Sequence, residues 1–192
     1  MRFLSLLLVA ALAAVAVAAC GSSSNGSSAP NPNAKEVSPP GDIPDNQAFV
    51  AYSPPGGGFT VKVPEGWARS SAGGTTTFTD KLNSISMESL PAGAAPTVRD
   101  ARRTEVPKLE KRVNGFRPGT VTTVTRKGGP AVRITYLAAA PADPVTGKAH
   151  TNAVERYVFH KGGKDVVITL SGPKGADNVD PWRIVTDSVT LR

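Results

Sequence analysis

The stretch Gly58-Phe59-Thr60-Val61-Lys62-Val63-Pro64-Glu65-Gly66-Trp67 contains the clearest local pattern in this sequence of 192 residues. Its apolar residues Phe59, Val61 and Val63 alternate with polar ones, which is the two-residue period of a strand with one buried face. The Pro-Glu-Gly that follows favours a turn. The stretch therefore predicts a half-buried strand that ends in a turn just before Trp67.

Further strands are predicted on both sides of this stretch, because apolar residues alternate there between clusters of turn residues. We expect strands at 48–53, 75–79, 85–90, 121–127, 131–139, 154–160 and 165–171. Gly128-Gly129-Pro130 and Lys161-Gly162-Gly163-Lys164 each join two of these strands as in a hairpin. Neighbouring strands are therefore expected to pair in antiparallel fashion.

Two segments predict helices instead. Thr97 can cap a helix that runs to about Asn114, with apolar residues along one side, and Pro107 inside it predicts a kink or break. A second helix is expected to begin at Asp180, with Pro181 at its first position, and to reach about Ser188. A few helices beside an antiparallel sheet predict a layered α+β domain.

The N-terminus carries the pattern of an export signal. Met1-Arg2 is positively charged, and the apolar run at 3–17 is too short and wrongly flanked for a transmembrane helix. Val17-Ala18-Ala19-Cys20 resembles the lipobox of bacterial lipoproteins, which implies cleavage before Cys20, a diacylglyceryl group on its sulfur and often acylation of the new amino group. The alternative is an ordinary cleavage site followed by an incidental thiol, but a lone cysteine at this position favours the lipobox.

Three parts of the chain are predicted: a signal peptide at 1–19, a lipidated cysteine and disordered tether at 20–47, and a single domain at 48–192. Of the 27 positions from Gly21 to Gln47, 18 are Ser, Pro, Gly or Asn. So polar a segment buries too little surface to offset the entropy of ordering. The expected location is the extracytoplasmic face of the cell membrane, with the domain held there by its lipid anchor.

The charge of the chain favours anionic partners without pointing to nucleic acid. With 22 Lys and Arg against 15 Asp and Glu, the chain carries +7, and removal of residues 1–19 leaves +6. The basic residues are scattered and interleaved with acids, unlike a nucleic-acid-binding stripe. An envelope protein, the membrane or an anionic envelope polymer is the expected partner, and nucleic acid is not.

Several of these features together resemble PsbP-like domains. The stretch 58–67 resembles the opening hairpin of that family, where an aromatic strand runs into Pro-x-x-Trp, and 128–132 resembles its G-x-P-A turn. The long helix after two further strands and the short last helix are also similar. Together with the leader and the Ala-, Gly- and Pro-rich composition, the chain looks most like actinobacterial lipoproteins of the LpqN type. The resemblance implies an α/β/α sandwich around an antiparallel sheet, and binding in place of catalysis.

Patterns that carry chemistry are scarce. His150 and His160 are the two histidines, and neither belongs to a nucleophile–base or zinc-binding motif. Asp177 and Asp180 come nearest to a cluster of metal ligands, but helix capping explains Asp180 more simply. We therefore expect no catalytic residue, no metal site and no cofactor.

A binding surface is the remaining candidate, with Arg99, Arg103, Lys111 and Trp182 as its residues. The basic residues belong to the densest basic run of the chain, at 99–112. Interleaved acids make a solvated helix face with ion pairs an equally good interpretation of that run. Trp182 is balanced between a ligand platform and a core residue, whereas Trp67 at its turn is expected in the core.

Three functions remain open from the sequence. The leading hypothesis is a non-catalytic binding or accessory lipoprotein of the cell envelope. The second is a carrier of an apolar ligand such as a lipid, which an apolar cavity would favour. The third is a cell-wall enzyme, which a converging cleft of carboxylates with raised pKa values would favour.

Overall fold

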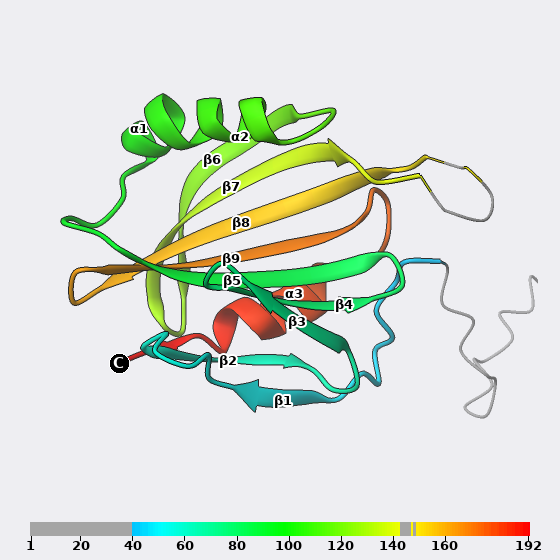
Figure 1. The fold of residues 1–192 in the computed structure, drawn as a ribbon, viewed down its shortest axis with the longest axis horizontal. Coiled ribbons are helices and arrows are strands. Elements are labelled where there is room, and N and C mark those ends of the chain that lie inside the picture. The colour runs from blue at the N-terminus through cyan, green and yellow to red at the C-terminus, as the bar shows by residue number, and fades with distance from the viewer. Residues whose placement is uncertain (1–39, 143–146, 148) are drawn as a thin grey trace, which may run out of the picture. The chain divides into compact units, whose positions relative to one another are not determined.

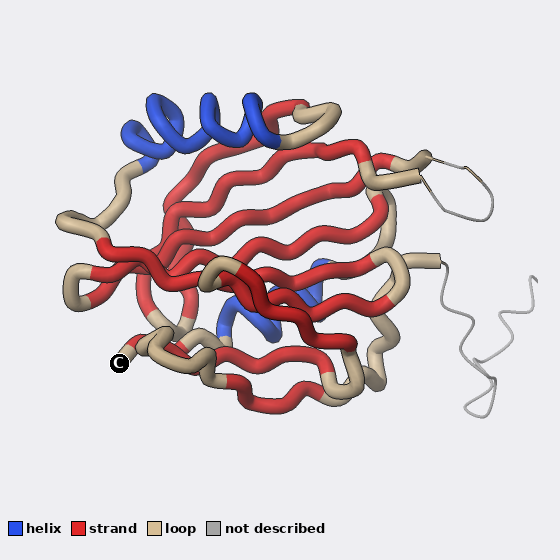
Figure 2. The backbone as a smooth tube through the Cα atoms, viewed as in Figure 1, coloured by secondary structure: helices blue, strands red, loops and turns tan. Residues whose placement is uncertain are grey.

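The computed structural model describes residues 40–142, 147 and 149–192, which form two antiparallel sheets and a few helices (Figures 1 and 2). The predicted signal peptide and the tether up to residue 39 lie outside the described residues. In chain order the elements are β1 (Phe49–Tyr52), β2 (Phe59–Pro64), β3 (Ala68–Ala72), β4 (Thr75–Asp80), β5 (Asn83–Pro91), α1 (Val98–Asp100), η1 (Ala101–Glu105), α2 (Val106–Arg112), β6 (Arg117–Arg126), β7 (Gly129–Ala139), β8 (Thr151–Lys161), β9 (Lys164–Pro173), α3 (Val179–Asp187) and β10 (Thr190–Leu191).

The large sheet has seven strands in the order β3-β4-β5-β9-β8-β7-β6, and the small sheet has the order β1-β2-β10. All of the pairs are antiparallel, and both predicted hairpins, β6–β7 and β8–β9, are confirmed. The sequence analysis missed β3, whose five residues are all exposed and show no apolar period. The opening stretch forms β2, and its alternating side chains Phe59, Val61 and Val63 are buried as predicted.

Both faces of the large sheet are covered, which confirms the layered architecture. The helical segment α1–η1–α2 packs on one face, and α3 with the small sheet packs on the other (Figure 1). Side chains of β7 and β8 alternate between these faces, because successive residues of a strand point to opposite sides. Ile134 and Val154 are buried under the first helical segment, whereas Tyr157 and Phe159 are buried on the side of α3.

The first helical segment accommodates its proline without a break. Thr97 caps the helix as predicted, because its Oγ1 accepts a hydrogen bond from the backbone N–H of Asp100 at 3.1 Å. Pro107 lacks the N–H that an α-helix needs at that position. The turns at Ala101–Glu105 widen to a π-helix just before it, and the chain continues as α2. The expected interruption is therefore a local change of pitch.

The last helix begins earlier than predicted. The structure places its start at Val179 and its N-cap at Asn178, in place of Asp180. The side chain of Asn178 makes no capping hydrogen bond, because it is used elsewhere. It is 3% exposed, and it binds the segment that precedes β1.

That preceding segment, residues 41–47, is packed on the domain, and the prediction of disorder is wrong for it. Ile43 is 3% exposed and donates its backbone N–H to Asn178 Oδ1 at 2.8 Å. The carbonyl oxygen of Gly41 accepts from Asn178 Nδ2 at 3.0 Å and from Asn83 Nδ2 at 2.9 Å. The composition predicts a tether because the segment is polar and has a single Ile. The amides that bind it belong to Asn83 and Asn178, which lie far away in the sequence. We call residues 41–47 the strap.

Replacement of Asn178 by Ala is expected to lower the free energy of unfolding by about 2–4 kcal/mol, because buried groups of the strap and of Asn83 lose their partner. Chemical denaturation measures this loss. Limited proteolysis should also begin to cut within residues 41–47 of the variant, but not of the wild type. Asn46→Ala is the matched control, because Asn46 is an exposed strap residue. Equal stabilities of the two variants would contradict the assigned role of Asn178.

Candidate functional site

An apolar cavity of about 620 Å³ lies on the α3 side of the large sheet, and we call it the sheet cavity. Its walls come from β6, β7, β8, the β9–α3 connection and the first half of α3. Its volume is in the range of small-molecule sites, which are about 300–1,000 Å³. The lining residues are Arg117, Pro118, Gly119, Arg126, Arg133, Thr135, Tyr136, Leu137, Ala153, Val154, Glu155, Tyr157, Pro173, Ala176, Asn178, Val179, Trp182 and Arg183.

The register of the central strands determines which side chains line the cavity. Arg133 pairs with Tyr157, Thr135 with Glu155, and Leu137 with Ala153 across β7 and β8. These positions are two residues apart on each strand, so their side chains share one face of the sheet. The cavity therefore has an apolar part beside the Leu137–Ala153 pair, with exposed Arg117 at its edge, and a charged part beside Arg133 and Glu155.

The charged part is a connected network. Tyr157 donates its hydroxyl hydrogen to Glu155 Oε2 at 2.5 Å and accepts from Arg126 Nη2 at 3.0 Å. Arg133 Nη1 lies 3.5 Å from Glu155 Oε1, and Arg126 Nε lies 3.9 Å from Asp187 Oδ1. Burial, and then the carboxylate of Glu155, raise the pKa of the Tyr157 phenol, so its hydroxyl stays protonated over a wider pH range.

Among the described residues, three N–H groups of side chains that line the cavity have no hydrogen-bond acceptor. Trp182 is 8% exposed, and its Nε1 has no partner, nor has the Nε of Arg126 or of Arg133. Unpaired buried donors cost about 1–3 kcal/mol each and are uncommon in folded proteins. Their presence in the wall of one cavity makes this part of the molecule the best candidate for a binding site.

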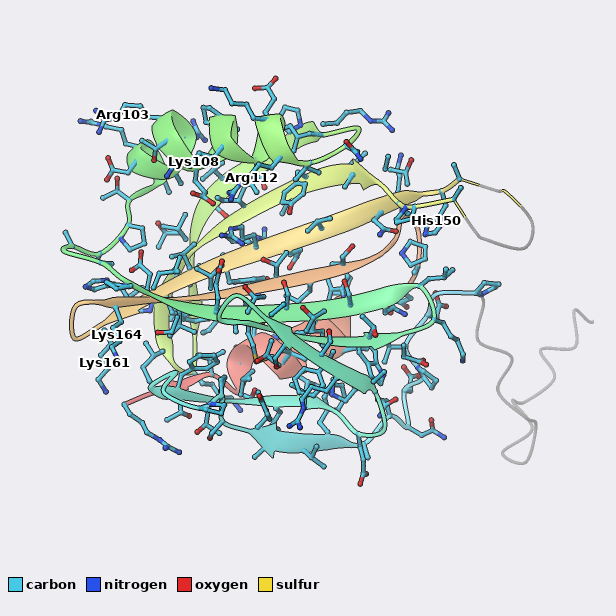
Figure 3. All side chains as sticks on the ribbon, in the orientation of Figure 1. Arg103, Lys108, Arg112, His150, Lys161 and Lys164 are labelled. Atoms are coloured by element: carbon cyan, nitrogen blue, oxygen red, sulfur yellow. The ribbon has the colours of Figure 1, made fainter. Side chains whose placement is uncertain are left out.

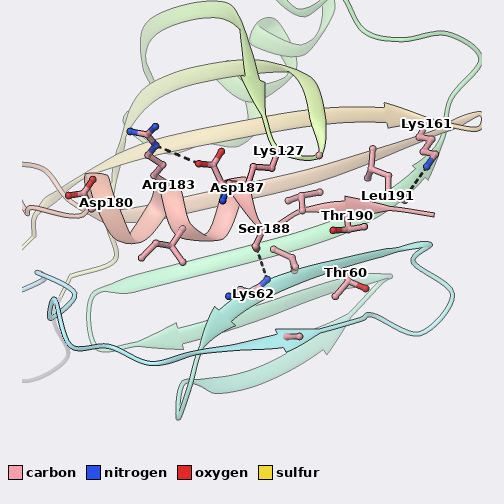
Figure 4. Close-up of a pocket in the computed structure, with 15 residues that line it drawn as sticks. Thr60, Lys62, Lys127, Lys161, Asp180, Arg183, Asp187, Ser188, Thr190 and Leu191 are labelled. Atoms are coloured by element: carbon pink, nitrogen blue, oxygen red, sulfur yellow. Dashed lines mark hydrogen bonds and ion pairs between the residues drawn. The ribbon is translucent and has the colours of Figure 1, made fainter.

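A second, wider groove of about 950 Å³ runs between β2, β10, α3 and the β6–β7 turn (Figure 4). Some of its polar groups have partners within the protein: Ser188 Oγ accepts from the backbone N–H of Lys62, and Lys161 donates to the carbonyl of Leu191. Arg183 pairs with Asp187 at 3.5 Å across one helical turn. Among the described residues, no side chain that lines the groove has a buried N–H group without an acceptor, so the sheet cavity is the stronger candidate.

The predicted surface residues do not lie together. Arg99, Arg103 and Lys111 are exposed on the α1–η1–α2 segment, along which Figure 3 labels Arg103, Lys108 and Arg112. Trp182 lies on the opposite side of the large sheet, in the core around α3. Arg103 pairs with Asp100 at 3.3 Å, as expected for a solvated helix face with ion pairs. Cys20, Val17, Ala18 and Ala19 lie outside the described residues.

The remaining candidates occupy separate places. Trp67 packs against the core around α3, as predicted. His160 Nδ1 contacts Asp165 Oδ1 at 2.7 Å across the β8–β9 hairpin, while His150 lies in the connection before β8. Among residues 40–142, 147 and 149–192, no group of three or more His, Cys, Asp or Glu side chains is arranged to hold a metal ion. Within the same residues, no helix has the length and apolar character needed to span a membrane.

Sequence reasoning missed the charged residues of the cavity. Arg133 and Glu155 occupy positions on β7 and β8 whose alternation otherwise carries apolar or small residues on that face. A charge within an inward-facing series is unusual, because burial of an unpaired charge is costly. This was the available signal, but only the strand register shows that the two residues meet.

The fold is that of the PsbP and Mog1 proteins. The cyanobacterial PsbP of Synechocystis aligns at 15% identity and a TM-score of 0.53, over 76% of this chain and 94% of that one. The Ran-binding protein Mog1p of Saccharomyces cerevisiae aligns at 14% identity and a TM-score of 0.50, over 76% and 96%. These likenesses confirm the PsbP-like fold that the resemblance implied.

Other comparisons add no further identification. LpqN of Mycobacterium tuberculosis, described as involved in cell envelope biogenesis, aligns at 15% identity and a TM-score of 0.41, over 77% of this chain and 86% of that one. The chain spans 45% of the length of a Bacteroides thetaiotaomicron protein that it matches with a TM-score of 0.47 at 14% identity. No protein-family profile and no curated protein sequence matches the chain.

Replacement of Tyr157 by Phe tests the cavity network. At pH 8 the variant is expected to lose about 1–3 kcal/mol of unfolding free energy, because Glu155 and Arg126 lose their shared partner. The pKa of Tyr157 is raised in the folded state, so this contribution is complete below pH 10 and is lost as pH rises through the folded-state value. Thermal unfolding of both proteins between pH 8 and pH 11 measures it. A difference that grows with pH would contradict the assigned network.

Proposed function

We propose that this chain is an exported, lipid-anchored and non-catalytic binding protein of the bacterial cell envelope, which holds an amphiphilic ligand in the sheet cavity. The observation that carries the proposal is the cavity itself. Its Leu137–Ala153 side is apolar, and a charged side lies within the same 620 Å³. Ligand sites are typically concave, mostly apolar pockets of this size with a few polar groups, so binding would explain this cavity, which opens to solvent beside exposed Arg117 and Val179.

The position of the strap supports an anchored function. Gly41 is bound by Asn178, and an added Cβ at Gly41 would collide with the ring of Pro173. Both Pro173 and Asn178 also line the sheet cavity. A chain anchored at Cys20 would therefore enter the domain beside the cavity, with 20 residues between the lipid and the strap. The side chain of Val179, at the same end of α3, is exposed.

The chemistry of the cavity favours binding over catalysis. Glu155 is its one carboxylate among the lining residues, and it is engaged by both Tyr157 and Arg133. A general base needs a carboxylate free to accept a proton from a substrate. A glycoside hydrolase would need a second carboxylate within the same site. The cell-wall enzyme is therefore the least supported of the three hypotheses.

Replacement of Cys20 by Ser is expected to abolish metabolic labelling of the protein with radioactive palmitate, because the thioether attachment point is lost. The variant should also move from the membrane fraction to the soluble extracytoplasmic fraction, since stable anchoring needs two or more acyl chains. Ser22→Ala is the control, because it changes the same segment without altering the lipobox. Continued palmitate labelling of the Cys20 variant would contradict the anchor.

The neutral fluorescent probe N-phenyl-1-naphthylamine tests the cavity directly. The exported Cys20→Ser chain should bind it without detergent, and Ala153→Phe should weaken binding about tenfold or more by filling the apolar side. The control replaces Arg99, Arg103 and Lys111 together by Glu. It should bind the probe like the parent, because these residues lie on the other side of the sheet.

Two outcomes would change the proposal. Absence of probe binding by the parent would remove the cavity as a ligand site. Loss of probe binding in the triple Glu variant, with its fold intact by circular dichroism, would move the site to the α1–η1–α2 face and favour the surface hypothesis.

A further inference from the structure

The charged side of the sheet cavity has more positive than negative groups. Arg126, Arg133 and Arg183 line it, against Glu155 alone, whereas Arg117 pairs with Leu137 across β6 and β7 and is exposed at the other end. Asp187 lies outside the lining but contacts both Arg126 and Arg183, and so offsets part of their charge. Arg133 shares Glu155 with the hydroxyl of Tyr157, and among the described residues Arg117 has no ion-pair partner.

The charged side of the cavity also contains hydrogen-bond donors that have no acceptor. Tyr157 donates its hydrogen to Glu155 and accepts from Arg126. Glu155 receives Tyr157 on one oxygen and Arg133 on the other. Among the described residues, Trp182 Nε1, Arg126 Nε and Arg133 Nε remain without acceptors, and Trp182 is only 8% exposed. Arginine side chains therefore outnumber carboxylates in the lining, which favours an anionic ligand over a cationic one.

Resting on the proposed binding function, we propose that the ligand of the sheet cavity is an amphiphile with one anionic oxygen headgroup, a carboxylate or a phosphate. Arg133 is the residue that recognises this headgroup, and Trp182 supplies a second donor at the wall. Guanidinium groups match the oxygens of carboxylates and phosphates, and such charge-assisted hydrogen bonds are stronger than neutral ones. The apolar chain of the ligand lies against Leu137 and Ala153, on the side of the cavity away from Arg133 along β7.

The pairing across the sheet explains why the two ends of the ligand are separated. Arg133 and Leu137 are four residues apart on β7, which corresponds to about 13 Å along a strand. Their partners Tyr157 and Ala153 are the same distance apart on β8. A headgroup at Arg133 therefore leaves room for several methylene groups before the chain reaches Ala153. This geometry distinguishes an amphiphile from a compact anion such as free phosphate.

Displacement of the bound neutral probe from the Cys20→Ser chain tests the headgroup. Dodecanoate and dodecyl phosphate should each displace it at about tenfold lower concentration than dodecanol, because hydrogen bonds to charged groups add about that factor in affinity. Dodecyltrimethylammonium should be weaker than dodecanol, and inorganic phosphate alone should not displace the probe. Preference for only one of the two anions would assign the headgroup to carboxylate or to phosphate and would still support the inference.

The variant Arg133→Met should lose the tenfold preference for dodecanoate while its affinity for dodecanol stays unchanged. Arg133→Lys should keep part of the preference, and Arg99→Met, an exposed arginine on the opposite side of the sheet, should keep all of it. If the Cys20→Ser chain with Arg133 intact binds dodecanoate and dodecanol with equal affinity, the headgroup inference is wrong. Because probe binding is measured first, that result is distinct from failure of the proposed function, in which the probe itself does not bind. The comparison of headgroups needs no change at Arg133, so it tests the inference even if Arg133→Met fails to fold.

Discussion

The buried amide groups of Asn178 and Asn83 connect three parts of the chain that are far apart in sequence. Asn178 Nδ2 donates to Asn83 Oδ1 and to the Gly41 carbonyl, both at 3.0 Å, while its Oδ1 accepts from the backbone of Ile43. The strap, the start of β5 and the start of α3 are thereby held at one point. The amide oxygen and the amide nitrogen of both side chains have hydrogen-bond partners, as a buried network requires.

The same network fixes the backbone around it. Gly172 on β9 passes so close to Asn83 and Asn178 that an added Cβ would collide with Asn83 Oδ1 and lie 2.8 Å from Asn178 Nδ2. A glycine is therefore required at this position by close approach and not by its dihedral angles. Since Asn178 also precedes Val179 and Trp182, the network determines where the first turn of α3 meets the sheet. The sheet cavity lies beside that turn, so its shape depends on the same contacts.

Local features of the fold could be predicted from the sequence, and long-range ones could not. The alternation in β2, the two glycine-containing hairpins and the Thr97 cap depend on neighbouring residues, and all were predicted. The placement of β5 beside β9 joins residues about 80 positions apart, such as Ile85 and Leu170, and no local pattern encodes it. The polar composition of the strap predicts a tether, although one Ile and two distant Asn side chains order it.

The candidate site likewise has features that the sequence predicts and features that depend on long-range packing. Trp182 was recognised from its type, but its place in a cavity wall follows from the packing of α3 on the sheet. Arg133 and Glu155 were not singled out, because each looks like an ordinary polar residue of a half-exposed strand. Register alone brings them to one face beside Tyr157. Interpretation of the basic run at 99–112 as a solvated helix face agrees with the ion pairs Arg103–Asp100 and Arg112–Glu105.

The indole N–H resonance of Trp182 gives the most direct test of the account, because this group is a buried donor without an acceptor in the cavity wall. In ¹H–¹⁵N spectra of the Cys20→Ser chain, Trp67→Phe assigns the two indole signals. Addition of dodecanoate should move the Trp182 signal downfield, as expected for a new hydrogen bond to a carboxylate, and leave that of Trp67 in place. An unchanged Trp182 signal at saturating dodecanoate, or an equal shift with dodecanol, would contradict an anionic headgroup in the sheet cavity.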